Sequence, residues 1–391
     1  MKRLRVGVIY GGRSSEHEVS LASAASVFRY LDPARYDPTP IRIDRDGRWS
    51  IPDQAPTALS AADVIKHSRV PDGGPVDTLP EAHLVAHPTR GTIVTIQREG
   101  SDSHMPAWAG AATVSRLALD VVFPVVHGPY GEDGTLQGLL ELANVAYVGA
   151  GVLTSAAAMD KAVAKVLFAA RGLPQVAHEV VAGHDWDTDP DAVVSRLEAA
   201  LGYAVFVKPA NLGSSVGVSK AASEPELRRG LALAREFDDK LIVEAAVPNA
   251  RELECAILGN ETPEVSVPGE IVPSGDFYDY DAKYVNDASR LIIPAALEPE
   301  QTDALHAMAI EAYRAVGGAG MARVDFLMSR DEERLYLNEI NTIPGFTTIS
   351  MYAKLWEASG LRYHRLLDRL IDLALARHAR KQRLRTTGPT S

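Results

Sequence analysis

The sequence predicts a multi-domain α/β protein, with α+β units following an N-terminal parallel sheet. Three observations lead to this expectation. The chain has 391 residues, which is long for a single hydrophobic core. Its first part alternates short apolar runs with stretches of helical spacing, as strands joined by crossover helices do. Later segments combine a few helices with several short strands, a pattern typical of α+β units.

The N-terminal unit, expected over residues 1–149, carries the parallel sheet. Residues 46–110 within it are rich in Pro, Gly, Asp and His, and we interpret them as an insertion of short strands and loops. Strands are expected at Arg5–Tyr10 and Leu119–Val126, and helices from a cap at Ser14 or Ser15 to about Tyr30 and over Gly134–Asn144.

Two further units follow, expected at 150–246 and 247–380, and a polar end at 381–391 is expected to be disordered, with the basic tail beginning near His378. In the central unit, helices are expected at Met159–Arg171, Pro190–Leu201 and Glu224–Glu236, and strands at His178–Ala182, Tyr203–Lys208, Val216–Lys220 and Lys240–Ala245. In the C-terminal unit, strands are expected at Leu253–Leu258, Leu291–Pro294, Ala322–Met328 and from Leu335, and helices at Glu298–Val316 and Ser350–Ala376.

The composition narrows the possible partners. A formal net charge of −11 argues against nucleic acid or an acidic membrane surface. No apolar run approaches the length of a membrane span. Cys255 is the only cysteine, so no intrachain disulfide can form. These features predict a cytoplasmic enzyme that acts on small molecules.

The most informative segment is a predicted hairpin in the C-terminal unit. Because alternate residues of a strand share a face, Arg323 points with Asp325, and Glu339 points with Asn341. If the chain turns about Glu332, Asp325 lies opposite Glu339. Carboxylates opposite each other repel, so a cation explains the pair, and hard oxygen ligands suit Mg²⁺. The alternative is a solvated strand face with one salt bridge.

A loop rich in Gly and Ser follows a predicted strand at Lys208–Lys220. Gly213 and Gly217 allow backbone N–H groups to approach an anion, and Ser214 and Ser215 add hydroxyl donors. The loop is not a P-loop, because GxxxxGK[ST] occurs nowhere in the chain, and no complete GxGxxG is present either. We interpret it as a lid over phosphates. A turn without a ligand is the alternative.

Other charged residues indicate a nucleotide site only when they are considered together with that loop. Lys161 opens a predicted helix and is a second phosphate candidate beside Lys208. Glu244 ends a strand at an expected hinge, and Glu252 follows eight residues later. A strand-to-hinge turn offers the polar groups and apolar slot that adenine and ribose require.

Together these segments resemble the D-alanine–D-alanine ligases of the ATP-grasp superfamily. The matching blocks occur in family order over nearly the whole chain, although no single block is decisive, and residues 46–110 and the tail lie outside them. They are GGRSSEHEVSL (Gly11–Leu21), HGPYGEDGTLQGLLE (His127–Glu141), YVGAGVLTSAAAMDK (Tyr147–Lys161), VKPANLGSSVGVSK (Val207–Lys220), DFYDYDAKY (Asp276–Tyr284), ARVDF (Ala322–Phe326) and NEINTIPGFT (Asn338–Thr347).

The resemblance implies a three-domain ATP-grasp fold and a two-step reaction. ATP would phosphorylate one D-alanine, and the amine of a second would attack the D-alanyl phosphate, making a dipeptide for peptidoglycan. By motif match, the metal ligands for two Mg²⁺ ions, or Mn²⁺, would be Asp325, Glu339 and Asn341. The ATP-binding residues would be Lys161, Lys208, Ser215, Glu244, Glu252 and Lys283.

The resemblance also implies roles around the two amino acids. Arg323 and the Gly345 N–H would stabilise the tetrahedral oxyanion. Glu16 would receive the ammonium of the first D-alanine, and Ser350 and Met351 would hold the carboxylate of the second. Ser214 and Tyr284 would hydrogen-bond with Glu16 and close the loop, and His127 would lie near the substrates in a role left open.

Three alternatives remain. A ligase of the same fold could join D-alanine to D-lactate or D-serine, and Tyr284 in AKY favours D-alanine as acceptor. A non-catalytic ATP-binding regulator would have no need for the paired carboxylates. A carboxylase-type enzyme lacks a biotin-carrier pattern here. The family also suggests a homodimer formed through the N-terminal unit.

Overall fold

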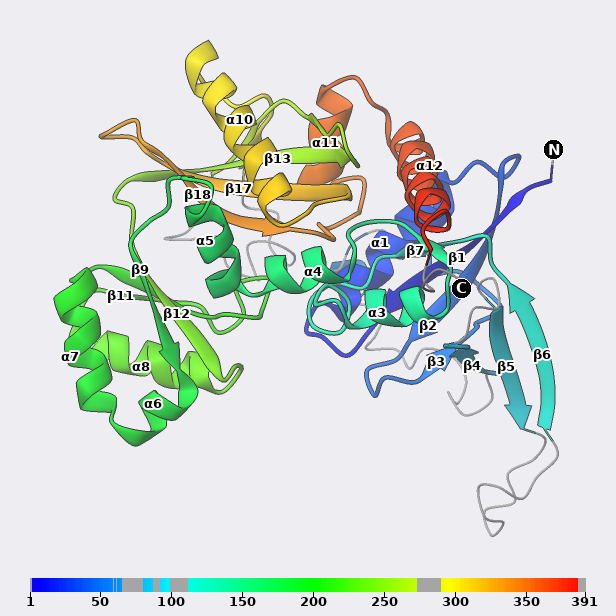
Figure 1. Ribbon diagram of the computed structural model, residues 1–391, viewed down its shortest axis with the longest axis horizontal. Helices are drawn as coiled ribbons and strands as arrows, with labels where there is room; N and C mark the ends of the chain where they lie inside the picture. The colour runs from blue at the N-terminus through cyan, green and yellow to red at the C-terminus, as the bar shows by residue number, and fades with distance from the viewer. Residues whose placement is uncertain are drawn as a thin grey trace, which may run out of the picture.

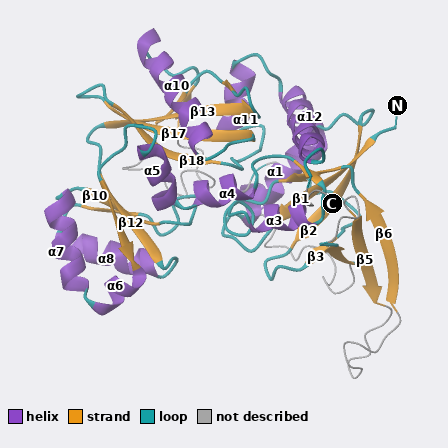
Figure 2. Ribbon diagram, in the orientation of Figure 1, coloured by secondary structure: helices purple, strands orange, loops and turns teal. Residues whose placement is uncertain are grey.

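The computed structural model describes residues 2–58, 60, 62–64, 80–86, 92–98, 112–272 and 290–385. Within these ranges the strands gather in three sheets, one each in the N-terminal, central and C-terminal parts of the chain (Figures 1 and 2). None of the described helices is long and apolar enough to span a membrane.

The N-terminal sheet has eight strands in the order β6-β5-β4-β3-β2-β1-β7-β8. They are β1 (Leu4–Gly11), β2 (Tyr36–Ile43), β3 (Trp49–Ser50), β4 (Glu81–Leu84), β5 (Thr92–Arg98), β6 (Ala112–Ala118), β7 (Val121–Pro124) and β8 (Ala146–Tyr147), with helices α1 (His17–Tyr30) and α3 (Thr135–Leu142).

Half of this sheet is parallel, as the sequence predicts. Strand β1 runs parallel to both β2 and β7, and β7 runs parallel to β8. The other half is antiparallel, because β3 to β6 follow one another as neighbours from β2 outwards. The described part of the 46–110 insertion therefore supplies strands that widen the sheet away from β1.

The central unit begins with two short helices and contains a four-stranded antiparallel sheet in the order β11-β10-β12-β9. Its elements are α4 (Val152–Met159), α5 (Lys161–Ala169), β9 (His178–Ala182), α6 (Gly183–Thr188), α7 (Pro190–Leu201), β10 (Val205–Pro209), β11 (Ser219–Ala221), α8 (Glu224–Arg235) and β12 (Lys240–Ala245).

One face of the central sheet is apolar and the other carries charge. Val205 and Val207 of β10 and Val243 of β12 form a core with α7 and α8. Since side chains alternate along a strand, Lys208 and Glu244 project from the opposite face. The alternation in the sequence thus directs these two residues away from the helices.

The C-terminal sheet has the order β16-β15-β13-β17-β18, and β14 pairs with β13. Its elements are β13 (Ala250–Gly259), β14 (Glu264–Val265), β15 (Gly269–Val272), β16 (Arg290–Ile292), α10 (Pro299–Ala315), β17 (Gly320–Ser329), β18 (Leu335–Asn341), α11 (Met351–Ala358) and α12 (Tyr363–Lys381).

The two faces of this sheet belong to different cores. Cys255 and Val324 pack with α10, whereas Ala256 and Met321 pack in a core shared with α11, α12, β1 and β7. Helix α12 therefore joins the C-terminal sheet to the N-terminal one (Figure 1). Arg323 and Asp325 lie on the same face as Met321, opposite α10.

The single helix predicted for Ser350–Ala376 is wrong. The chain forms two helices, and Gly360, between them, has a φ of +89°. This left-handed conformation is easily reached only by glycine, and it ends α11 so that α12 can start in a new direction.

The predicted beginning of a disordered tail at His378 is also wrong. Helix α12 continues to Lys381, whose ammonium pairs with Glu141, and Arg380 pairs with Glu261. One turn earlier, the guanidinium of Arg377 donates to Tyr147 O at 2.9 Å and lies 4.5 Å from the Tyr147 ring centroid.

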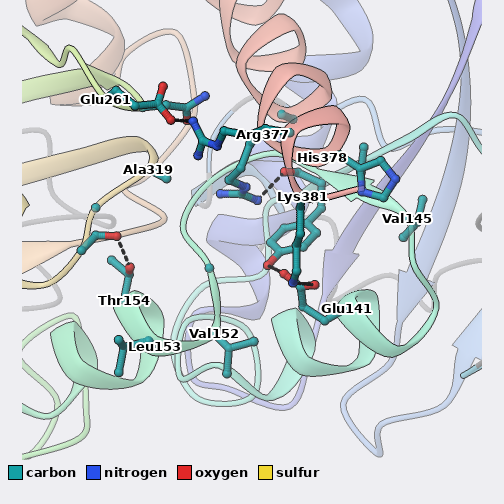
Figure 3. A pocket seen from close by; sticks show the side chains of 18 of the residues that line it. Glu141, Val145, Val152, Leu153, Thr154, Glu261, Ala319, Arg377, His378 and Lys381 are labelled. Carbon is teal, nitrogen blue, oxygen red and sulfur yellow. Dashed lines mark hydrogen bonds and ion pairs between the residues drawn. The ribbon is translucent and has the colours of Figure 1, made fainter. Parts of the chain in front are cut away.

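These contacts line a cavity of about 780 Å³ where α12 meets α3 and the start of α4 (Figure 3). The basic end of the chain is helical because its side chains contact the N-terminal unit. Sequence composition does not predict these contacts. Residues 386–391 lie outside the described part of the chain.

Candidate active site

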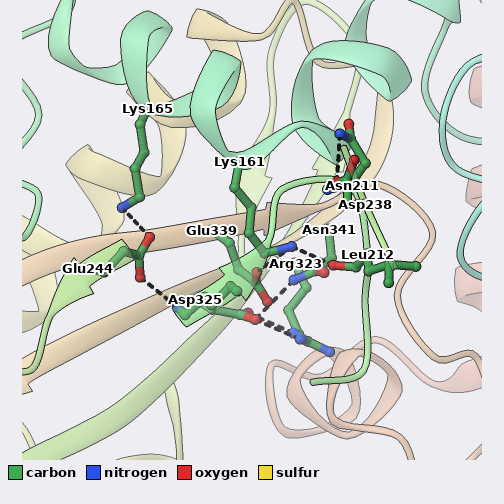
Figure 4. Close-up of polar contacts among 11 residues, drawn as sticks. Lys161, Lys165, Asn211, Leu212, Asp238, Glu244, Arg323, Asp325, Glu339 and Asn341 are labelled. Atoms are coloured by element: carbon green, nitrogen blue, oxygen red, sulfur yellow. Dashed lines mark hydrogen bonds and ion pairs between the residues drawn. The ribbon is translucent and has the colours of Figure 1, made fainter. Parts of the chain in front are cut away.

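The hairpin of β17 and β18 has the predicted register at Arg323 and Asp325, and a β-bulge after Asp325 shifts the pairing by one residue nearer the turn. Arg323 pairs with Asn341, and Asp325 pairs with Glu339. The Asp325 carboxylate accepts two hydrogen bonds from Arg323, at 2.7 and 2.6 Å, and one from Asn341 Nδ2 at 2.9 Å (Figure 4). The salt bridge of the alternative interpretation is therefore present alongside the paired carboxylates.

A third carboxylate, which the sequence analysis did not single out, completes a row across three strands. Strand β13 places Glu254 directly opposite Asp325 on the side away from Glu339. Its Oε2 lies 3.1 Å from Arg323 Nε. Burial alone lowers the pKa of Arg323, but the charges of Asp325 and Glu254 raise it well above its ordinary value. The guanidinium is thus permanently charged.

The donor set fits a hard divalent cation. Asp325, Glu339 and Asn341 present two carboxylates and an amide oxygen from adjacent strands of one half-buried hairpin. Oxygen ligands of this kind suit Mg²⁺, which keeps water or phosphate oxygens in its remaining positions.

Lysines from the central unit approach this hairpin. The ammonium of Lys161 donates to Leu212 O at 2.5 Å and lies 3.7 Å from Glu339 Oε2. Lys208 Nζ donates to Glu244 Oε2 at 2.6 Å, and Lys165 Nζ lies 3.0 Å from Glu244 Oε1 (Figure 4). The two predicted phosphate lysines therefore lie beside the carboxylate row, Lys161 from helix α5 and Lys208 from strand β10 of the central sheet.

Charge pairing controls the protonation of this group. Burial would raise the pKa of Glu244, but Lys208 and Lys165 lower it to about 2. Burial likewise would lower the pKa of Lys208, but Glu244, and then Glu339 and Glu252, raise it above its ordinary value. Glu244 is thus a buried carboxylate with both oxygens facing lysines, and its side chain is not available to adenine as the sequence analysis expected.

The Gly/Ser loop reaches the N-terminal unit. Ser214 Oγ donates to Glu16 Oε1, nearly two hundred positions away, which is the contact that the resemblance implies. Ser214 and Ser215 have φ values of +50° and +58°. A Cβ on Gly213 would lie 3.1 Å from Glu16 Oε2, so glycine permits the close approach. The loop therefore crosses directly over Glu16.

His127 has both ring nitrogens engaged within the protein. Nδ1 lies 2.9 Å from Ile343 O, and Nε2 lies 2.9 Å from Ser23 Oγ, which also accepts from Phe346 N at 3.1 Å. The side chain is buried, and burial lowers its pKa. This geometry contradicts a direct substrate contact for His127 and makes it a support for the loop after β18.

Glu132 holds the backbone N–H of the same residue, Ile343, and was missed by the sequence analysis, although it lies inside the HGPYGEDG block. Its carboxylate accepts from Gly128 N at 2.7 Å and from Ile343 N at 3.3 Å. Burial first, and then the charge of Glu16, raise the pKa of Glu132 to about 8. His127 and Glu132 thus clamp the C=O and the N–H of Ile343.

The loop held by this clamp contains Gly345 and ends at α11. Ser350 Oγ accepts from Thr347 N at 3.1 Å, and a Cβ on Gly345 would lie 3.2 Å from it. Met351 opens α11 with its side chain buried in the core, so only its backbone N–H can meet a ligand.

The remaining predicted residues divide into two groups. Glu252 is half-buried on β13 opposite Leu327, near enough to Lys208 to affect its pKa. Lys283 and Tyr284 lie outside the described residues, so their predicted contacts stay predictions.

Comparison with known proteins agrees with this geometry. Residues 5–150 match the family described as D-ala D-ala ligase N-terminus, and residues 167–372 match D-ala D-ala ligase C-terminus. The chain belongs to the D-alanine–D-alanine ligase family. The resemblance noted from the sequence motifs is thereby confirmed.

Individual relatives of this ligase family extend over nearly the full length. The chain is 47% identical to the D-alanine–D-alanine ligase of Heliobacterium modesticaldum, with 98% of each chain covered. It is 43% identical to D-alanine–D-alanine ligase A of Escherichia coli K12, covering 99% of this chain and 100% of the relative.

Solved structures agree on the fold. The D-alanine-D-alanine ligase from Coxiella burnetii superposes with a TM-score of 0.76 at 36% identity, covering 98% of this chain and 97% of that one. The VanG D-Ala:D-Ser ligase from Enterococcus faecalis gives 0.78 at 32% identity, covering 95% and 100%. The predicted α/β fold of the ATP-grasp ligases is confirmed.

Proposed function

We propose that this protein joins two D-alanine molecules, with hydrolysis of ATP to ADP and phosphate, and so supplies D-alanyl-D-alanine for peptidoglycan. The observation that carries the proposal is identity of 43–47% over nearly the full length to proteins named D-alanine–D-alanine ligase. Activation of a carboxylate by ATP requires cations for the phosphates and ligands for a metal, and charged residues suited to both lie close together in the candidate active site.

The nucleotide would bind between the central and C-terminal units. Lys161 and Lys208 are the cations for its phosphates, and Ser215 and Lys283 are further contacts by motif. Glu252 is the acceptor for ribose, whereas Glu244 acts through Lys208, because its carboxylate faces lysines. Catalysis then consists mainly of positioning and charge stabilisation.

Asp325, Glu339 and Asn341 would hold two Mg²⁺ ions, or Mn²⁺. Bound there, the metal supplies positive charge that neutralises the phosphate oxygens and orients them. Support comes from the register that sets Asp325 opposite Glu339 and from the amide of Asn341 beside them.

The amino acids would lie between the N-terminal and C-terminal units. Glu16 receives the ammonium of the first D-alanine, and Ser214 with Tyr284 closes the loop over it. Transfer of the terminal phosphoryl group to its carboxylate gives D-alanyl phosphate, which replaces a poor leaving group with phosphate.

The second D-alanine attacks this intermediate as a free amine. The backbone N–H of Met351 and the hydroxyl of Ser350 hold its carboxylate, and Arg323 with Gly345 N–H stabilises the tetrahedral oxyanion before phosphate departs. His127 positions Gly345 through Ile343, which is supported by its two ring contacts.

The proposal also covers the organisation of the protein. The chain would divide into three domains at 149/150 and 246/247. It would form a homodimer through the N-terminal unit and catalyse the reaction in the cytoplasm. D-Alanine is the favoured acceptor because relatives with 43–47% identity are named D-alanine–D-alanine ligases, and because Tyr284 within AKY resembles the pattern of dipeptide-forming ligases. D-Lactate and D-serine are the competitors to exclude.

One assay tests the function. Phosphate release is measured with ATP, Mg²⁺ and D-alanine, and again with D-alanine plus excess D-lactate or D-serine, with products identified by mass. We expect one phosphate per D-alanyl-D-alanine and little mixed product. Phosphate release without dipeptide, or mainly mixed product, would contradict the assignment.

A further inference from the structure

Lys165 is a buried lysine without a role in the scheme above. It lies on α5, one helical turn after Lys161, and its side chain is 1% exposed. Its ammonium lies 3.0 Å from Glu244 Oε1 but makes no hydrogen bond of good geometry among the described residues. The other oxygen of Glu244 accepts from Lys208 (Figure 4).

The arrangement leaves one positive charge uncompensated within the trio of Lys165, Glu244 and Lys208. If Glu244 faced Lys208 alone, the two charges would cancel, and an anion would gain little from approaching. Because Lys165 shares the carboxylate, the pair of lysines exceeds it by one charge. A buried excess charge is costly unless a ligand of opposite sign reaches it.

Other carboxylates in the region do not remove this excess. Glu339 lies 3.7 Å from Lys161, and the proposed function assigns it to a metal. Glu252 raises the pKa of Lys208 less than Glu244 does. Among the carboxylates in the described part of the chain, the structure records an ion pair with Lys208 for Glu244. The neutralisation of Glu244 by another cation therefore increases the positive charge that Lys208 presents to a ligand.

We infer that Lys165 is a positioning residue for ATP: it neutralises Glu244 and so leaves the charge of Lys208 free for the nucleotide phosphates. The inference rests on the proposed function, since it needs ATP to bind beside Lys208. It differs from a purely structural role, in which Lys165 would only compensate a buried carboxylate.

The test is ATP binding by calorimetry in Mg²⁺, without D-alanine, for the parent protein and for Lys165→Met, Glu244→Gln and the double variant. Lys165→Met should weaken ATP binding about tenfold, through the loss of one nearby charge in a partly desolvated site. The double variant should return to within about threefold of the parent, because the site again carries one net positive charge, that of Lys208.

Arg229→Met is the control. Arg229 is exposed on α8 of the same central unit and lies outside the Gly/Ser loop, so its removal changes the net charge equally and should leave ATP binding unchanged. Thermal unfolding checks that each variant is folded. Lys165→Gln replaces Lys165→Met if the latter does not fold, because its amide can still donate to Glu244.

Normal ATP binding by Lys165→Met would contradict the inference, and so would weak binding that Glu244→Gln does not restore. In both cases the parent protein still binds ATP and makes the dipeptide, so the proposed function stands. A parent protein that does not bind ATP would contradict the proposed function and this inference together.

Discussion

Two charged clusters face each other across the candidate site, and they have opposite excess charge. On the C-terminal sheet, the row of Glu254, Asp325 and Glu339 has three carboxylates against the single guanidinium of Arg323. In the central unit, Lys165 of α5 and Lys208 of β10 share one carboxylate. The first cluster therefore has a net negative charge, and the second has a net positive charge.

The difference shows what kind of ligand the site suits. Neither cluster can be neutral by itself, and buried unbalanced charge costs free energy. A nucleotide bound with a divalent cation supplies both kinds of charge. The positive charge of the metal would neutralise the carboxylate row, and the negative charge of the phosphates would neutralise the lysines. Lys161 lies 3.7 Å from Glu339 and donates to Leu212 O, so it joins the carboxylate row to the Gly/Ser loop.

The largest expected effect comes from removing one charge of the carboxylate row. Glu339→Gln keeps the size of the side chain but weakens the hold on Mg²⁺, so kcat should fall at least about a hundredfold while the protein remains folded. Steady-state rates over a range of Mg²⁺ concentrations measure it. Glu332→Gln, exposed at the turn of the same hairpin, is the control. Near-parental activity of Glu339→Gln at limiting Mg²⁺ would remove Glu339 from the metal site.

A smaller loss is expected when the one cation of that row changes shape. Arg323→Lys keeps the charge but cannot bridge Asp325 with two hydrogen bonds, and it reaches an oxyanion less well, so kcat should fall about tenfold or more. Rates at saturating ATP and D-alanine test this, with Arg330→Lys, half-exposed just after β17, as control. A changed KM for ATP with an unaltered kcat would instead assign Arg323 to ground-state binding.

A pH-dependent effect should distinguish the two clusters further. Glu132, near Glu16 and Arg323, has a pKa raised from 4.5 to about 8, so its contribution to stability is complete below pH 4.5 and is lost as the pH rises through about 8. The pKa of Glu244 is about 2, so Glu244 adds no slope in this range.

The Tm of the parent protein should therefore fall more between pH 6 and about 8.5 than that of Glu132→Gln. Thermal unfolding over this range is the measurement, and Asp133→Asn, one residue along, is expected to keep the parental slope. Equal slopes for the parent and Glu132→Gln would mean that Glu132 is ionised throughout.

The smallest effect concerns ion pairs away from both clusters. Lys381 is 55% exposed where it pairs with Glu141, so Lys381→Ala should cost about 1 kcal/mol or less and leave kcat unchanged. Chemical denaturation and the dipeptide assay check both points. A large loss of activity would show that the end of α12 communicates with the site.

Local pattern was enough to predict several features of the site. The alternation in Ala322–Met328 and Leu335–Asn341, with a short polar turn between them, leaves few possible registers, and the one predicted is observed at Arg323 and Asp325. The motif resemblance likewise placed Ser214 against Glu16. The ends of helices are harder to predict from local pattern. The predicted helix Ser350–Ala376 continues through Gly360, where the structure ends one helix before the next begins.

The sequence by itself therefore determined the three sheets, the faces of the strands and the pairing within one hairpin, because these depend on residues close in the chain. Only the tertiary structure decided which distant residues complete the clusters: Glu254 beside Asp325, Lys165 beside Glu244, and Glu132 on Ile343. The physical reason is that the period of a strand decides which side chains share a face but not which strand or helix lies next to it. Those neighbours follow from the packing of apolar faces over the whole molecule.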